Sequence, residues 1–441
     1  MEKNILYITW GETIVDFGIF KNQVLEQLKL IKRERPDINL FLLSGIPIGN
    51  KKLFKNPFTF VRELKHIKAV CKENGIHFFW HWIPVLSPWF YTPPAKVGFY
   101  DLSQTNFIKR FIEKNKIKLV HSRSYTPARL LLKTRKKFPQ LSFKLIFDTR
   151  GNFPEEGRLK SFFSDKDYAF WKKKEKELFK ESDAVVNVSD TFTDYVKTLT
   201  DNPEIYTIYT STNLSIFNRN NEEERTISRE KCNITTDEKV LVYLGDLGEN
   251  GWHDKTNLFA IYKYFKETFG KTKLLLITRN LREEFEESFS EVAGKVDELI
   301  VIKGETPKDV NRFLNMADYA SLPFKKVNNP LDQILGYTMI ASKTGEYLAC
   351  GLPIVTNTAI GAASKLVKET ETGVVYRMGD EKAIKNPLLE IESNREVIIK
   401  KCIDTSKRFD AQENARLYLG IYDKLFKSAS HSTQLKMSSK S

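Results

Sequence analysis

The segment at residues 342–355 reads SKTGEYLACGLPIV and has the pattern of a short helix followed by a buried strand. Gly351 and Pro353 mark the helix end, because glycine is favoured just past a helix C-terminus and proline does not continue a helix. Lys343 and Glu346 lie in the opening turn, where unpaired N–H groups and the helix dipole favour a diphosphate. Lys343 can add a mobile cation there, and Glu346 can accept ribose hydroxyls. By spacing alone, a surface ion pair is the commoner arrangement.

Short apolar runs and longer helical patterns alternate along the rest of the chain. The expected strands are 5–10, 39–44, 77–83, 118–121, 143–148, 184–188, 239–245, 273–278, 298–302, 319–322 and 353–356. The expected helices include 20–33, 58–72, 107–115, 170–181, 255–265 and 414–426. This alternation is typical of parallel sheets covered by helices, and a polar stretch at 219–230 separates two such sets. We therefore predict an α/β fold with two Rossmann-like doubly wound domains, and a ligand site in the cleft between them.

The composition is that of a folded, basic protein. The 441 residues are 41% hydrophobic and carry a formal net charge of +14. This charge suits an anionic partner, but no RNP, KH or helix-turn-helix pattern is present, so we expect no nucleic acid. The four scattered cysteines argue against a zinc ribbon, an iron–sulfur cluster or a disulfide framework. The opening residues lack a signal-peptide pattern, and the apolar stretch at 77–91 is too short to span a bilayer, so we expect a cytoplasmic protein.

Motifs of several other enzyme classes are missing from the sequence. There is no Gly-x-Ser-x-Gly elbow, no P-loop and no HExxH helix, which lowers the hydrolase, NTPase and metalloprotease interpretations. Asp165 and Asp167 form a DxD pattern, but they open a highly charged helix, so helix capping is the favoured interpretation. We expect no metal and no other cofactor.

The complete string resembles the donor-binding motif of glycosyltransferase family 4, the retaining glycosyltransferases with the GT-B fold. Short members of that family read Lys-x-x-Glu-Tyr-Leu-Ala-Cys-Gly-x-Pro, as this chain does. The resemblance implies that Lys343, Thr344, Gly345 and Glu346 bind a nucleotide sugar, with Lys343 on the phosphates, Glu346 on the ribose, and both in catalytic positions. Longer members carry a further Glu eight residues earlier, contacting the transferred sugar, and here that position is Thr338.

A glycine-rich turn follows the expected strand at 239–245. Lone glycine spacings usually mark a loop, but a turn between a strand and a helix can also bring the backbone close to a pyrophosphate. The further donor-binding residues expected here are Gly245, Gly248, Lys255 and Arg279. Many relatives place an Arg directly after the first glycine, whereas this chain has Asp246. The resemblance therefore implies that Lys255, Lys343 and Arg279 supply the positive charge.

Polar residues also close two neighbouring strands of the first half: His121, Arg123, Asp148 and Arg150. By position alone, His121 is more often structural than catalytic, and Asp148 with Arg150 is equally typical of an ion-pair network that holds loops. Relatives place a His in the cleft of the first domain, in contact with the transferring sugar. The resemblance therefore implies a catalytic His121, with the other three residues on the acceptor side of the cleft.

The segment at 78–100 is rich in aromatic residues and is preceded by several lysines. Its aromatic residues include Trp80, Trp82, Trp89, Phe90, Tyr91, Phe99 and Tyr100. Aromatic side chains next to cations suit a membrane interface or the stacking of sugar rings. The alternative is a core-packed strand and loop. In a family member this segment belongs to the acceptor domain, so we expect Trp89 at a lipid-linked acceptor, with peripheral contact to anionic lipid at the inner face of the plasma membrane.

The resemblance leads to a specific prediction for the whole chain. The acceptor domain is expected at 1–210, the nucleotide-sugar domain at 211–408, a C-terminal helix crossing back to the first domain at 409–426, and a disordered tail at 427–441. The expected reaction moves a sugar from a nucleoside-diphosphate sugar to a hydroxyl of a glycan or lipid-linked acceptor, with retention, in cell-surface polysaccharide synthesis. The alternatives are a GT-B nucleotide-sugar epimerase and a catalytically inactive sugar-nucleotide-binding protein.

Overall fold

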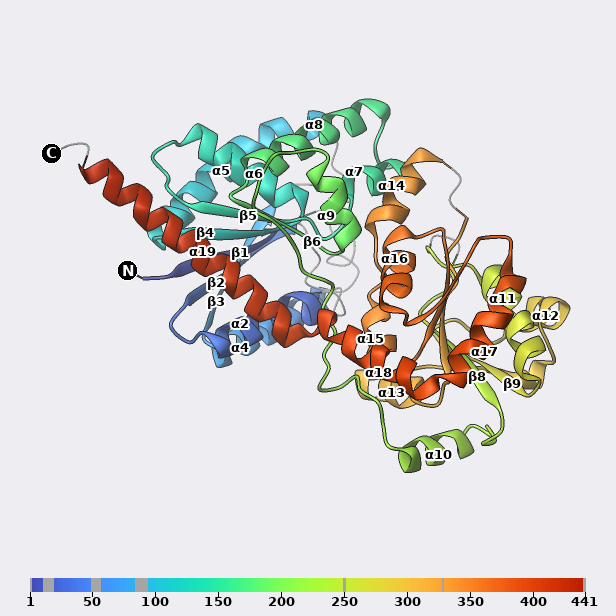
Figure 1. Cartoon of the computed structure of the whole chain (residues 1–441). Coiled ribbons are helices and arrows are strands. Elements are labelled where there is room, and N and C mark those ends of the chain that lie inside the picture. The colour runs from blue at the N-terminus through green and yellow to red at the C-terminus, as the bar shows by residue number, and fades with distance from the viewer. Residues whose placement is uncertain are drawn as a thin grey trace. The chain divides into compact units, whose positions relative to one another are not determined.

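The structure, a computed structural model, describes residues 2–10, 20–48, 57–83, 94–248, 251–326 and 329–438. The chain divides into two compact units (Figure 1). Unit 1 comprises Met1–Tyr209 and Ala411–Ser441, and unit 2 comprises Thr210–Asp410. The domain boundaries expected after residues 210 and 408 each lie within two residues of these divisions.

The sheet of unit 1 is entirely parallel, with the strand order β3-β2-β1-β4-β5-β6-β7. Its strands are β1 (Asn4–Trp10), β2 (Asn39–Pro47), β3 (Ile76–Ile83), β4 (Leu119–Arg123), β5 (Lys144–Asp148), β6 (Ala184–Asn187) and β7 (Ile205–Thr207). All residues of β1 are buried, and two separate apolar cores cover the two faces of the sheet. Burial on both faces is why these strands are continuous apolar runs in the sequence.

Helices pack on both faces of this sheet. They are the π-helical turn η1 (Lys21–Leu25), α2 (Glu26–Glu34), α4 (Pro57–Glu73), α5 (Pro94–Lys114), α6 (Tyr125–Lys137), α7 (Phe153–Leu159), α8 (Asp165–Glu181), α9 (Asp190–Lys197) and α19 (Ala411–Ser438). The long C-terminal helix α19 belongs to unit 1, where it packs against α2 and β4 (Figure 1). The expected return of the chain to the first domain is therefore confirmed. The helix also continues to Ser438, whereas the sequence predicts a disordered tail from residue 427.

The sheet of unit 2 is also entirely parallel and has the order β10-β9-β8-β11-β12-β13. Its strands are β8 (Lys239–Leu244), β9 (Thr272–Ile277), β10 (Leu299–Ile302), β11 (Tyr319–Leu322), β12 (Ile354–Asn357) and β13 (Gly373–Tyr376). Its α-helices are α10 (Glu222–Glu230), α11 (Lys255–Phe269), α12 (Glu283–Val292), α13 (Pro307–Leu314), α14 (Pro330–Thr338), α15 (Lys343–Ala349), α16 (Gly361–Thr370), α17 (Lys385–Ser393) and α18 (Arg395–Ser406). Three 3-10 turns complete it: η3 (Val296–Glu298), η4 (Glu381–Ile384) and η5 (Lys407–Phe409).

Both sheets have the strand order of the Rossmann fold, so the predicted fold class is confirmed. The sequence did not indicate β7 or β13, because runs of three or four residues carry too little pattern. Helix α5 begins earlier than the expected residue 107. The DxD pattern opens α8, where Ser164 and Asp167 form a reciprocal capping box, as the capping interpretation predicts.

Candidate functional site

Helix α15 begins beside the carboxyl end of β8, where the strand order of unit 2 reverses between β8 and β11. Two contacts fix it there. The backbone N–H of Leu244 donates to the Tyr347 hydroxyl at 2.7 Å. A Cβ on Gly345 would collide with Thr212 and Phe409, so glycine at this position lets α15 pack closely against these two residues. Lys343 and Glu346 therefore project from a firmly held turn at the position where parallel sheets bind ligands.

The ammonium group of Lys343 has only neutral partners among the described residues. Its Nζ donates to the Tyr243 hydroxyl at 3.2 Å and lies 4.3 Å from the centre of the Tyr243 ring. It also lies 3.5 Å from Nδ1 of His253. Burial lowers the pKa of Lys343 to about 7, although Glu346 and Asp246 oppose this shift. The cation is thus held in place but not neutralised, which prepares it for an anionic ligand.

The carboxylate of Glu346 makes no hydrogen bond and no ion pair with any residue that the structure describes. The residue is partly buried, and burial raises the pKa of Glu346 to about 7, with Lys343 acting against the rise. A half-buried carboxylate without donors is costly to keep unless a ligand supplies them. Glu346 is therefore the strongest candidate in unit 2 for binding hydroxyl groups.

The turn after β8 brings the backbone next to this pair. Gly245 has φ +122°, and a Cβ there would lie 2.7 Å from Nζ of Lys343. Glycine is therefore needed at Gly245 for both its conformation and the close approach. A Cβ on Gly248 would meet nothing within 4 Å, so the described contacts place no such demand on that position.

His253 also belongs to this cluster, although it is not among the residues predicted from the sequence. Its ring packs 4.7 Å from Phe324 and 5.5 Å from Tyr243. Burial, together with Lys343 and Lys325, holds the pKa of His253 well below its usual range, so the ring is neutral. Because Nδ1 accepts from Lys343, the proton is assigned to Nε2, which is buried without a partner among the described residues. The only sequence signal was a histidine shortly after the glycine turn.

The remaining residues predicted to bind the donor lie in different surroundings. Nζ of Lys255 donates to the Glu284 carbonyl at 3.1 Å. The exposed Arg279 pairs with Asp246, and this contact holds the pKa of Asp246 below its usual range. The Thr344 hydroxyl is fully buried and has no partner within the described part of the chain. The structure thus brings Lys343, Glu346 and Gly245 together, but it does not bring Lys255 to them.

Thr338, which replaces the second acid of longer family members, is buried at the end of α14. Its hydroxyl donates to the Ile334 carbonyl at 3.0 Å within the same helix. This position therefore supplies no carboxylate for a sugar.

The polar residues of unit 1 form a closed network instead. His121 is fully buried, and its ring nitrogens contact the Tyr422 hydroxyl at 2.7 Å and Oδ2 of Asp148 at 3.2 Å. Oδ2 of Asp148 also accepts from the Tyr418 hydroxyl at 3.0 Å. Burial lowers the pKa of His121, so the ring is neutral. The contacts of His121 and its complete burial fit the structural interpretation, and its contact with a sugar stays a prediction.

The two arginines of this region converge on one side chain. Arg123 and Arg150 both donate to Oε1 of Gln23, at 2.8 and 3.0 Å, and Arg150 lies 3.7 Å from Asp148. Burial alone would raise the pKa of Asp148, but Arg150 and His121 lower it overall, so this carboxylate is ionised. The ion-pair network is therefore present. Trp89, expected at the acceptor, lies outside the described residues.

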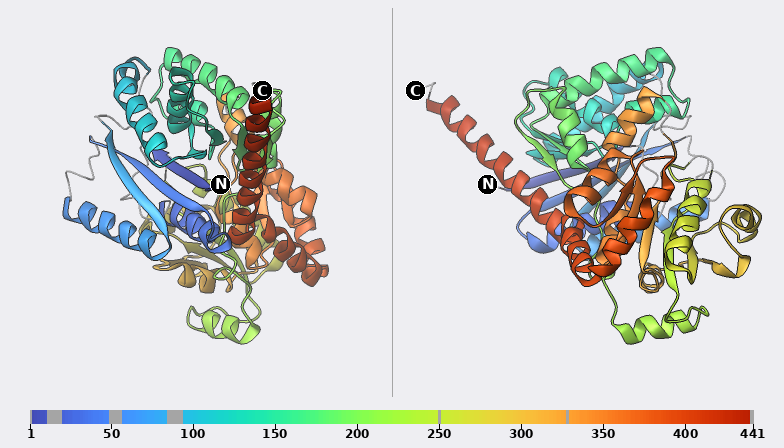
Figure 2. Two further views of the ribbon diagram at one scale, coloured as in Figure 1. Left: turned by 90° about the vertical axis from the view of Figure 1, so that its left-hand side faces the viewer. Right: turned by 45° about the vertical axis from the view of Figure 1, so that its right-hand side comes forward.

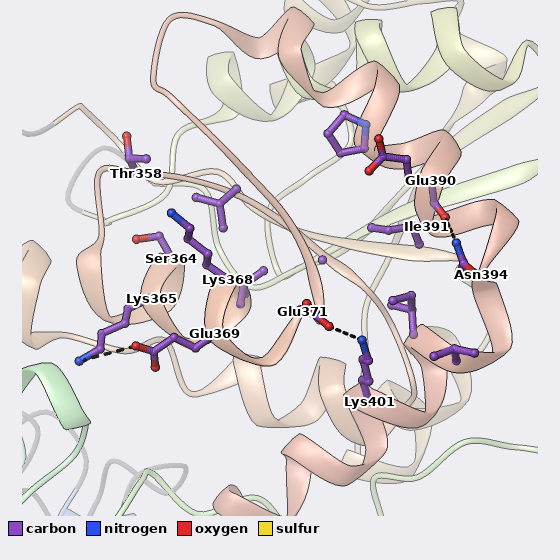
Figure 3. Close-up of a pocket in the computed structure, with 16 residues that line it drawn as sticks. Thr358, Ser364, Lys365, Lys368, Glu369, Glu371, Glu390, Ile391, Asn394 and Lys401 are labelled. Atoms are coloured by element: carbon purple, nitrogen blue, oxygen red, sulfur yellow. Dashed lines mark hydrogen bonds and ion pairs between the residues drawn. The ribbon is translucent and has the colours of Figure 1, made fainter.

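A surface pocket of unit 2 lies elsewhere, between α16, β13, α17 and α18 (Figure 3). Ion pairs Lys401–Glu371 and Lys365–Glu369 cross its rim, and Val367 is part of its lining. None of the predicted site residues lines this pocket.

Two kinds of feature are absent from the described ranges, a metal-ligand cluster and a membrane-spanning helix. No three His, Cys, Asp or Glu side chains gather there in an arrangement that could hold a metal ion. No helix in them combines the length and apolar character needed to cross a bilayer.

Comparisons with known proteins find one matching family model and several similar folds. The family model for glycosyl transferases of group 1 matches residues 224–416, which include the cluster around Lys343 and Glu346. This match supports a glycosyltransferase. No curated protein matches the chain in sequence.

Solved structures of similar fold cover nearly the whole chain. A glycosyltransferase from Rickettsia africae ESF-5 has a TM-score of 0.65 at 15% identity, covering 97% of this chain and 99% of the other. Sucrose-phosphate synthase from Thermosynechococcus elongatus has a TM-score of 0.65 at 15% identity, covering 97% and 100%. Anabaena HepE in complex with UDP has a TM-score of 0.63 at 11% identity, covering 96% and 100%. At these identities the likeness shows the fold, which is that of GT-B glycosyltransferases.

Proposed function

We propose that this chain is a retaining glycosyltransferase of family 4. It would move a hexosyl-type sugar from a nucleoside-diphosphate sugar to a hydroxyl of a glycan or lipid-linked acceptor in cell-surface polysaccharide synthesis. The observation that carries the proposal is the pair Lys343 and Glu346, which lie together in the first turn of α15 without a salt-bridge partner among the described residues. The family match over 224–416 supports the same chemistry.

Lys343 would stabilise the leaving diphosphate. Breaking the bond between sugar and phosphate builds negative charge on the phosphate oxygens, and a preorganised cation lowers the energy of that transition state. Tyr243 and His253 hold the ammonium from two sides without cancelling its charge. HepE, a protein of similar fold, binds UDP, which supports a nucleoside diphosphate as the leaving group. No metal is needed in this scheme.

Glu346 would bind the ribose of the donor. A vicinal diol donates two hydrogen bonds to one carboxylate, which satisfies an acceptor that otherwise has no donor in the described structure. The acceptor hydroxyl would attack from the face that the diphosphate leaves, and a phosphate oxygen would take its proton. This route follows from the family resemblance and predicts retention, which NMR of the product's anomeric proton would test.

The acceptor side is proposed for unit 1. A lipid-linked acceptor would bring a cytoplasmic enzyme to the inner face of the plasma membrane as a peripheral protein. The residues placed on this side by the sequence, Arg123, Asp148 and Arg150, would then organise the loops around the acceptor, because Arg123 and Arg150 share Gln23 and Arg150 lies beside Asp148.

The second candidate is a catalytically inactive sugar-nucleotide-binding protein. Two observations favour it: Asp246 neutralises Arg279 next to the site, and Thr338 offers no carboxylate. Both candidates bind the nucleotide, so turnover distinguishes them. A nucleotide-sugar epimerase is distinguished by its product, which forms without an acceptor.

Thermal unfolding in the presence of UDP-, GDP- and CMP-sugars would test donor binding. A ligand at 100 times its Kd stabilises the folded state by about 2.7 kcal/mol, so a matching nucleotide should raise the Tm by several degrees. We expect Glu346→Ala to keep the ligand-free Tm and to lose most of this shift. Glu287→Ala, an exposed glutamate on α12, should keep it. An equal shift in Glu346→Ala, or no shift with any nucleotide in the wild type, would overturn the proposal.

A further inference from the structure

Helix α4 has an exposed face that is partly apolar and partly basic. The helix packs through Phe60, Ile67 and Cys71, which are buried. Residues three or four positions apart share one side of a helix, and on the opposite side this spacing gives Phe58, Val61, Lys65, Lys68 and Lys72, here called the α4 face. Phe58 is 86% exposed and Val61 is 49% exposed. Such exposure of a whole phenylalanine is unusual on a surface that contacts only water.

The three lysines of the α4 face are exposed and have no partner among the described residues. None of Lys65, Lys68 and Lys72 makes a hydrogen bond or an ion pair within the described parts of the chain. Of the two glutamates on α4, Glu63 is buried, and the exposed Glu73 is the last residue of the helix. The face is therefore clearly cationic.

Aromatic side chains of the neighbouring strand extend this surface. Strand β3 is at the edge of the described sheet, with Trp80 44% and Trp82 36% exposed. The Trp82 ring stacks on Phe60 at 5.9 Å and meets Trp80 at 5.1 Å, which places both indoles beside the first turns of α4. Figure 2 shows α4 along the outside of unit 1, next to this edge of the sheet.

We propose that the α4 face, together with Trp80 and Trp82, is a docking surface for a bilayer that contains anionic lipid. Phe58 and the two indoles would enter the interface between headgroups and acyl chains, where amphipathic aromatic rings are favoured. Lys65, Lys68 and Lys72 would contact lipid phosphates. A flat, mixed surface of this kind, with cations along a helix and apolar groups at one end, suits a membrane surface better than a folded partner's pocket. The inference is independent of the donor site in unit 2.

Sedimentation with vesicles would test the electrostatic part. We expect the wild type to sediment with vesicles of phosphatidylcholine and phosphatidylglycerol and to stay in solution with phosphatidylcholine alone. Each lysine near an anionic surface contributes about fivefold to partitioning, so the triple Lys→Gln variant at 65, 68 and 72 should bind about 100-fold more weakly. The matched control removes Lys173, Lys176 and Lys180, which have the same spacing, are exposed on α8 and also lack partners in the described structure. This control should bind like the wild type.

A second pair of variants tests the apolar part. Phe58→Ser should weaken binding about tenfold, whereas Leu102→Ser, at a residue 60% exposed on α5, should leave it unchanged. Brominated lipid should quench the tryptophan fluorescence of the wild type, and Trp80→Phe with Trp82→Phe should remove that quenching.

Three outcomes would overturn the proposal. Equal losses in the two triple-lysine variants would mean that net charge alone causes binding. Absence of sedimentation with anionic vesicles would exclude the surface directly. A wild-type dimer that Phe58→Ser dissociates without lipid present would assign the face to a second copy of the chain. Unchanged Tm values would show that the variants are folded.

Discussion

The polar clusters of the two units lie in sheets of similar strand order but differ in how their charges are paired. In unit 1 the cluster includes His121 within β4 and Asp148 at the end of β5, whereas in unit 2 it lies at the carboxyl end of β8. In unit 1, both ring nitrogens of His121 are bonded, and Asp148 accepts from His121 and Tyr418. In unit 2, Lys343 has only neutral partners, and Glu346 has none among the described residues. Oδ1 of Asp148 is buried without a partner in the described structure, but the charges of Asp148 and Arg150 in unit 1 lie beside each other. Such pairing stabilises the fold, whereas the charges of Lys343 and Glu346, which have no such partner in the described part of the chain, are prepared for a ligand.

The largest expected effect concerns the stability of the internally paired cluster of unit 1. Asp148→Asn should lower the free energy of unfolding by about 3 kcal/mol, because it leaves Arg150 and the ring of His121 without their buried anion. Urea unfolding followed by circular dichroism measures this. Asp423→Asn is the matched control, since Asp423 also anchors α19, through exposed ion pairs to Lys3 and Arg35, and should cost less than about 1 kcal/mol. Equal costs would remove the distinction between the clusters.

The next effect concerns nucleotide-sugar binding at the cluster around Lys343 in unit 2. Lys343→Gln should weaken nucleotide-sugar affinity about 30-fold, because a charge-assisted contact to phosphate is lost. The free energy of unfolding should not fall, since the variant no longer buries a cation. Isothermal titration calorimetry gives the affinity. Lys255→Gln, whose Nζ bonds the Glu284 carbonyl, should change it less than about twofold, and a larger change would return Lys255 to the donor site.

The smallest effect is the pH dependence of donor binding. Burial lowers the pKa of Lys343 to about 7 and raises the pKa of Glu346 to about 7. The cation is therefore lost above this pH and the carboxylate is protonated below it, so affinity should be greatest near pH 7. It should fall about threefold between pH 7 and pH 8, because ionisation of Glu346 partly offsets the loss of the Lys343 cation.

A nucleotide sugar is the suitable probe for this measurement, because its diphosphate has no titrating terminal group. The decline above pH 7 should disappear in Lys343→Gln, which has no proton to lose at this position. A decline that persists in this variant would assign the titration to another group.

The sequence was sufficient for the fold and for part of the candidate site. The alternation of apolar runs predicted both sheets, because strands that are buried on two faces are continuous apolar segments in the sequence. The motif around Lys343 and Glu346 lies within one helix turn, so local sequence contained both residues. His253 could not be found this way, since it lies 90 residues from Lys343 in the chain and meets it only in the folded unit.

The burial of His121 could not be predicted for the same physical reason, because it depends on residues far away in the chain. The position of His121 near a strand end suggested that its side chain faces an open cleft. Tyr418 and Tyr422 instead cover this region from a helix far along the chain, with Tyr422 301 residues away from His121. No local pattern around His121 contains that information. The burial of His121 depends on tertiary contacts that only the structure supplies.

The return of α19 to unit 1 also has a consequence for the order of assembly during synthesis. The strands of unit 1 are translated before unit 2, yet the hydroxyls that complete its central polar cluster are carried by Tyr418 and Tyr422, which follow unit 2 in the sequence. Unit 2 is contiguous and has all its residues before then. Unit 1 is therefore begun before unit 2 but completed after it, and a nascent chain that stops before α19 leaves His121 and Asp148 without the tyrosines that cover them.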